Sequence, residues 1–126
     1  MAFHGHVSEA EKHRLLARSW VHAMPSLKEG WGLVVVEAGV HGTPTVAFRS
    51  AGGPADSIVD GETGLLVAAA EAEPEEEAFA RTLESLLTDD ARREQMSHAA
   101  RRWVSRFRWE DCIEAWERLL LREAGR

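Results

Sequence analysis

Two glutamates flank a glycine-rich turn in the first third of the chain, and their type and spacing suit hydroxyl recognition. Glu29 precedes the turn at residues 30–32, and Glu37 follows a few positions later. Glycines in such a turn allow the backbone to approach a ligand closely and expose its N–H groups. Carboxylates accept hydrogen bonds from vicinal hydroxyl groups. This segment is therefore a candidate site for a sugar or a ribose.

The residues that follow the turn, 33–40, have a pattern that fits two structures. Three consecutive valines favour a strand, whereas the glycines at 39 and 42 are typical of a helix that ends. A helix that begins near Leu33 would offer unpaired N–H groups to an anion such as phosphate. Phosphate between two carboxylates would suit a nucleotide sugar. The alternative that spacing leaves open is a plain turn with two surface glutamates.

Short apolar runs alternate with helical patterns along the first two thirds of the chain. The expected strands are residues 21–24, 43–48 and 65–68. The expected helices are residues 8–18 after a Ser8–Glu11 capping box, 74–88, a helix capped by Asp89 or Asp90, and one from about Trp109. This alternation indicates an α/β fold with a parallel sheet over residues 1–89 and a helical tail over 90–126.

Size and composition exclude several classes of protein. The chain has 126 residues, a net charge of −6 and a single cysteine, so one domain over residues 1–126 is expected. Its apolar runs fall far short of the ~20 residues of a membrane-spanning helix, and its N-terminal segment lacks the apolar stretch of a signal peptide. A lone cysteine fits a reducing compartment. We expect a soluble, cytoplasmic protein.

Charge is distributed unevenly along the chain. Residues 1–90 hold 6 basic and 15 acidic side chains, whereas residues 91–126 hold 9 and 6. A basic C-terminal end is one signal of nucleic-acid binding. Acidic side chains interrupt it here, namely Glu110, Asp111, Glu114 and Glu117. We therefore expect solvated helix faces and no nucleic-acid partner.

Histidine, cysteine and tryptophan supply weaker signals. Four histidines, His4, His6, His22 and His41, lack acidic or cysteine partners at ligand spacing, so no metal site is expected. Cys112 lies between acidic residues and is expected to be a structural thiol. The five tryptophans are expected in the core rather than as ligand platforms, with Trp31 as the exception because it lies in the candidate site. Trp103, Trp109 and Trp116 are expected to anchor the helical tail, which would lack its usual neighbour here and could pack on a partner chain.

The segment 25–38 closely resembles the motif of retaining GT-B glycosyltransferases, which transfer a sugar from a nucleotide-sugar donor. Glu29 and Glu37 take the positions of the family's two glutamates, with the residues between them in its Gly-aromatic-Gly-Leu slot. Further blocks match in the family's order: Phe3-His4-Gly5-His6-Val7 with its Phe-x-Gly-x-Val strand, Pro25-Ser26, Gly42-Thr43-Pro44-Thr45-Val46-Ala47, the stretch from Gly52-Gly53 to Val67, and Phe107-Arg108-Trp109.

The resemblance implies the C-terminal, donor-binding part of such an enzyme, with a partial Rossmann-like parallel sheet, a helix over 33–40 and a helical tail. In the family the first glutamate contacts hydroxyls of the donor sugar, so Glu29 is the expected catalytic position. The second contacts the ribose, which assigns Glu37. The backbone cradle for sugar and phosphate oxygens is Gly30, Trp31, Gly32 and Leu33. The family is thought to use no protein nucleophile, and no metal or other cofactor is implied.

The chain also departs from the family's pattern. Gly39 and Val40 replace a Met-Ala pair, and Asp56 replaces a glutamate. The family's diphosphate-binding Arg and Lys, its base-binding loop and its acceptor domain have no counterpart here, so weak binding of the nucleotide sugar is expected. The sheet lacks its first strands and leaves the strand near Val21 unpaired; such edges recruit partners, which predicts a homodimer or larger oligomer. The alternative is a non-catalytic truncated paralogue, or a fragment, that serves association.

Overall fold

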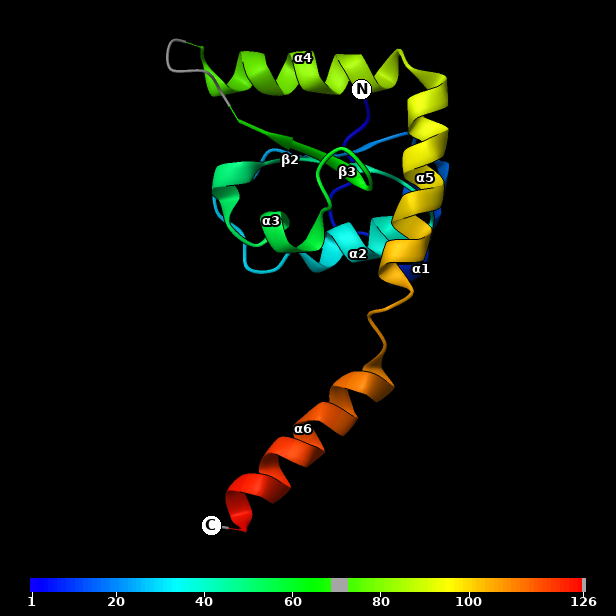
Figure 1. Cartoon of the computed structure of the whole chain (residues 1–126). Helices are drawn as coiled ribbons and strands as arrows, with labels where there is room; N and C mark the ends of the chain where they lie inside the picture. The colour runs from blue at the N-terminus through cyan, green and yellow to red at the C-terminus, as the bar shows by residue number, and fades with distance from the viewer. Residues whose placement is uncertain (69–72, 126) are drawn as a thin grey trace.

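The structure is a computed structural model of the chain, and it describes residues 1–68 and 73–125. Three parallel strands in the order β1-β2-β3 lie between helices, which confirms the predicted α/β class (Figure 1). In chain order the elements are α1 (Glu9–Arg18), β1 (His22–Met24), α2 (Leu33–Val40), β2 (Thr45–Phe48), the 3-10 turn η1 (Arg49–Ala51), α3 (Pro54–Ser57), β3 (Gly64–Val67), α4 (Glu75–Leu87), α5 (Asp90–Val104) and α6 (Trp109–Ala124).

The sheet is covered on both faces, as the continuous apolar runs of β2 and β3 require. α4 crosses one face, and α2 and α3 lie on the other (Figure 1). On the α4 side, Val46 and Phe48 of β2 pack with Phe79 and Leu86. On the opposite side, the core cluster is Met24, Val35, Ala47, Ile58 and Leu66. Alternate residues of the central strands therefore contribute to two separate cores.

Helix α2 settles the ambiguity at residues 33–40 in favour of the helix that the resemblance implies. Val35, Ala38 and Gly39 are its buried positions, so one side of the helix lies against the protein interior. At Gly39 an added Cβ would lie 2.5 Å from Cγ1 of Val104 in α5. Burial of this apolar face outweighs the weak local preference of three valines for a strand.

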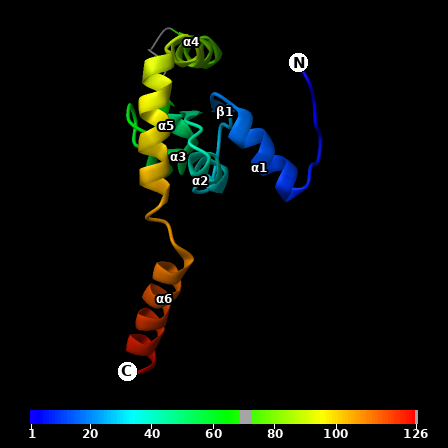
Figure 2. The same cartoon turned by 90° about the vertical axis from the view of Figure 1, so that its right-hand side faces the viewer.

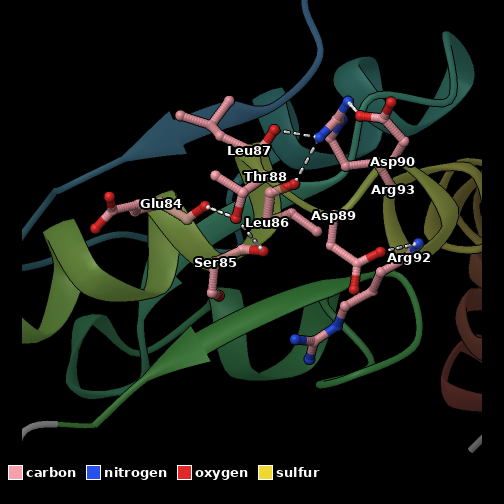
Figure 3. A network of polar contacts seen from close by, with 9 residues as sticks. All are labelled: Glu84, Ser85, Leu86, Leu87, Thr88, Asp89, Asp90, Arg92 and Arg93. Atoms are coloured by element: carbon pink, nitrogen blue, oxygen red, sulfur yellow. Dashed lines mark hydrogen bonds and ion pairs between the residues drawn. The ribbon is translucent and has the colours of Figure 1, made fainter.

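The junction of α4 and α5 is held by a compact polar network (Figure 3). The Asp89 carboxylate caps α5 by accepting a hydrogen bond of 2.9 Å from the Arg92 N–H, which confirms one of the two predicted caps. Arg93 donates to the carbonyl oxygens of Leu86, at 2.9 Å, and of Leu87 at the end of α4. A guanidinium thereby satisfies carbonyls that a helix end leaves without partners.

The predicted strand at residues 3–7 is wrong. The N-terminal residues form an irregular segment, and the Phe3 side chain is 87% exposed. A strand needs a neighbour for its backbone hydrogen bonds, and the three described strands offer none there. A smaller difference concerns Pro74, which precedes α4 as its N-cap residue rather than opening the helix.

The expectation that most tryptophans lie in the core is also wrong. Trp109 and Trp116 are 79% and 59% exposed, Trp20 is exposed, and only Trp103 is half-buried outside the candidate site. Helix α6 extends away from the rest of the molecule (Figure 2), and none of its described residues is buried. Its apolar side chains therefore stay largely exposed among the described residues. No helix in the described part of the chain is long and apolar enough to cross a membrane.

Candidate functional site

The loop with the first glutamate is fixed by backbone contacts to the loop that follows β2. The Glu29 N–H donates a hydrogen bond of 2.8 Å to the carbonyl oxygen of Ala51, and Glu29 forms a parallel bridge with Gly52. Gly53 lies so close to the loop that an added Cβ would overlap the carbonyl oxygen of Gly30. The glycines at 52 and 53 therefore allow the segment after β2 to contact the loop that carries Glu29.

The same loop ends at the N-terminus of α2. Gly32 is the N-cap residue, with φ 81° and ψ 57°, a left-handed conformation that suits glycine. Its carbonyl oxygen accepts the first helical bond, 2.8 Å from the N–H of Val35, and no side chain caps this helix end. The structure therefore brings Gly30, Trp31, Gly32 and Leu33 to an uncapped helix start, where N–H groups and the helix dipole favour an anion.

Glu37 lies one turn inside α2, where it meets a residue that the sequence did not single out. The ammonium of Lys12 in α1 is 3.0 Å from each Glu37 carboxylate oxygen and 2.7 Å from Glu9. The Glu9 and Glu37 carboxylates raise the pKa of Lys12 above its usual value. Helical spacing within α1 relates Lys12 to Glu9, but no sequence signal links it to a residue 25 positions away.

Trp31 connects the loop to the turn before α6. Its ring packs edge-on against Phe107, with ring centroids 4.8 Å apart, and Phe107 packs in the same way against Trp103. The Trp103 indole N–H donates a hydrogen bond of 3.0 Å to the carbonyl oxygen of Ser57. A cavity of about 490 Å³ lies here, lined by Trp31, Leu33, Val36, Arg106, Phe107, Arg108, Trp109, Asp111 and Cys112. Glu29 and Glu37 are not among its lining residues.

The four histidines that the sequence singled out are spread over three parts of the structure. His4 and His6 are in the irregular N-terminal segment, His22 is in β1, and His41 follows α2. His41 Nε2 is 2.9 Å from Nδ1 of His13, a pair that the sequence did not suggest. Within residues 1–68 and 73–125, no group of three or more His, Cys, Asp or Glu side chains could hold a metal ion. Cys112 is free and exposed.

His22 predicts how stability changes with pH. Burial lowers the pKa of its imidazole, against a smaller opposing effect of Glu37. The unfolded chain therefore binds a proton that the folded chain resists, and His22 contributes stability that is lost as pH falls below about 6.5. The substitution His22→Gln should make the unfolding free energy depend less steeply on pH in this range, as measured by urea titrations at several pH values. His98→Gln, at an exposed position, should keep the slope, and an unchanged slope in His22→Gln would contradict the prediction.

Comparisons with known proteins agree on one family. The sequence profile described as glycosyl transferases group 1 matches residues 1–103. A D-inositol 3-phosphate glycosyltransferase of Corynebacterium diphtheriae is 43% identical over 97 residues, which are 77% of this chain but 22% of that protein. The chain thus spans about a fifth of the length of this relative.

Solved structures give the same result for the fold. Sucrose-phosphate synthase from Thermosynechococcus elongatus matches 98% of this chain and 30% of its own, at 27% identity and a TM-score of 0.85. The C-terminal domain of a glycosyl transferase group 1 family protein from Francisella tularensis matches 83% of this chain, at 24% identity and a TM-score of 0.61. The parallel sheet, the loop at the start of α2 and these matches lead to one conclusion: the chain belongs to the glycosyl transferases group 1 family and has the fold of part of a GT-B C-terminal domain.

Proposed function

We propose that this chain is the donor-binding part of a retaining glycosyltransferase and binds a nucleotide-diphospho-sugar. The observation that supports this most is the uncapped start of α2, with loop 29–32 immediately before it and Glu37 one turn inside. A diphosphate suits N–H groups at a helix start. Carboxylates on either side suit the hydroxyls of a sugar and a ribose.

Each residue has a separate role in this proposal. Glu29 holds hydroxyls of the donor sugar, and within the described residues no hydrogen bond or ion pair occupies its carboxylate. Glu37 accepts from the ribose hydroxyls. The backbone N–H groups of residues 31–33 meet sugar and phosphate oxygens. These groups orient the donor and stabilise charge on the departing diphosphate, and no side chain here is assigned as a nucleophile.

The experiment compares Glu29→Gln and Glu37→Gln in NMR titrations with a nucleotide sugar and with the bare nucleotide. UDP-glucose and GDP-mannose are used beside UDP and GDP, so that a pyrimidine and a purine base are both tested. Glu29→Gln should weaken binding of the sugar nucleotides about tenfold and leave the affinity for UDP and GDP unchanged. Glu37→Gln should weaken both by a similar factor, since loss of a hydrogen bond to a charged group has this effect.

Glu62→Gln is the matched control, since Glu62 is exposed in the turn before β3, and it should bind as the parent chain does. Equal affinity of all three variants for the nucleotide sugars would refute the proposal. Affinity of the parent chain is expected to be weak, in the millimolar range, because backbone N–H groups and two carboxylates supply the contacts proposed for the donor.

Self-association stays a prediction beside this function. Strand β1 pairs with β2 alone among the described strands, so its other side is an edge of the sheet. Strand β1 has three residues, at the short end of the usual strand length, so few of its backbone groups are open to pairing with a second chain. Transfer of a sugar by the purified chain would exclude the alternative of a module that serves association alone.

A further inference from the structure

The contact between Lys12 and Glu37 joins a helix outside the glutamate motif to a residue inside it. The Lys12 ammonium is equidistant from the two carboxylate oxygens, at 3.0 Å from each, so it faces both at once. The Lys12 and Glu37 side chains are only 28% and 31% exposed. An ion pair with this geometry restricts the rotation of a carboxylate that would otherwise sample several orientations.

Lys12 is itself held in place. Glu9, one turn earlier in α1, lies 2.7 Å from the ammonium, and Ser8 caps this helix through the N–H of Glu11. An ammonium has three protons and a carboxylate has about four acceptor positions. Lys12 can therefore bind both glutamates while Glu37 keeps acceptor positions for a pair of hydroxyls.

We propose that Lys12 is a positioning residue that orients the Glu37 carboxylate toward the ribose hydroxyls of the donor, an inference that rests on the proposed function. A carboxylate that is oriented before binding loses less conformational freedom when the ligand arrives. Lys12 thereby raises affinity for ribose without touching the ligand. It has no effect on a nucleotide whose ribose lacks both hydroxyls, and this difference separates positioning from a general structural role.

The test measures binding of UDP and GDP, each beside its 2′,3′-dideoxy counterpart, by NMR titration. Lys12→Met keeps most of the side-chain stem and removes the charge. It should weaken UDP or GDP about fivefold, the factor that a partly exposed ion pair can supply, and leave the dideoxy nucleotides unchanged. Lys12→Arg should restore most of the preference. Arg18→Met, which removes an exposed positive charge from the same helix and leaves the Lys12–Glu37 contact in place, should bind as the parent chain does.

Circular dichroism and melting temperature establish that each variant is folded, and Lys12→Gln serves if the methionine variant is not. Equal weakening of ribo- and dideoxynucleotides by Lys12→Met, or no weakening, would overturn the inference. Glu37→Gln, measured in parallel, separates the two proposals. If it abolishes the preference for ribose while Lys12→Met does not, only the role of Lys12 fails. If Glu37→Gln also has no effect, or the parent chain binds no nucleotide, the proposed function fails with it.

Discussion

Replacement of Gly53 by alanine is expected to destabilise the chain by about 3 kcal/mol and to weaken nucleotide-sugar binding by more than tenfold. The added Cβ would overlap the Gly30 carbonyl and lie 2.5 Å from the Trp31 Cα. These atoms belong to the backbone and cannot rotate away as a side-chain end does. The loop that carries Glu29 must therefore move, and displacement of a binding group by about 1 Å is enough for a large loss.

The melting temperature should fall by roughly 10 °C, measured by differential scanning calorimetry, and the affinity loss should appear in the same titrations. Gly30→Ala is the control for stability, because it lies across the same contact and an added Cβ there meets nothing within 4 Å. It should melt close to the parent chain. A Gly53→Ala variant with unchanged melting temperature and affinity would show that this loop contact does not hold the site.

Much of the fold was predictable because local and long-range signals agree there. Ser8 and Glu11 predicted α1, and Asp89 caps α5 as one of two candidates. The apolar runs at β2 and β3 predicted buried strands, and both are fully buried. At residues 33–40 the local signals disagreed. There the helix depends on the contact of α2 with α5, which residue patterns do not encode. The resemblance to the family, rather than the pattern, predicted the helix.

The incorrect predictions share one physical cause. A strand at residues 3–7 needs a neighbouring strand, and none of the described strands pairs with this segment. Burial of Trp116 needs an element packed on α6, and α6 extends away from the sheet (Figure 2). Sequence pattern reports which face is apolar, and it does not report what covers that face. The same reasoning applies to Lys12, whose partner Glu37 is distant in sequence and adjacent only after α1 docks on α2.

The sequence predicted the loop and the helix start of the candidate site, but not the contacts that support them. The motif placed Glu29 and Glu37 on either side of a helix start, and the structure brings the loop residues 30–33 to that place. The support beneath the loop was not predicted: the Ala51 carbonyl, the close approach of Gly53 and the packing of Phe107 on Trp31. These groups come from segments whose proximity depends on the order of strands in the sheet.

Gly39→Ala is expected to destabilise the chain by about 2 kcal/mol, although helix propensity alone would stabilise it by about 1 kcal/mol. The added Cβ would lie 2.5 Å from Cγ1 of Val104, a branched side chain that is buried and cannot turn aside cheaply. Val104→Ala alone should also be destabilising, by about 2 kcal/mol, because it leaves a cavity at the contact of α2 with α5.

The double variant separates close packing from propensity as the reason for a glycine inside α2. Val104→Ala removes the methyl group that an alanine at position 39 would meet, so the new Cβ fills part of the space that is left. Urea titrations should show that the double variant is more stable than the sum of the single changes by at least about 1 kcal/mol. Additive losses would mean that the two side chains do not compete for this space. Coupling would show that glycine at 39, where the family has methionine, compensates for a valine in the facing helix.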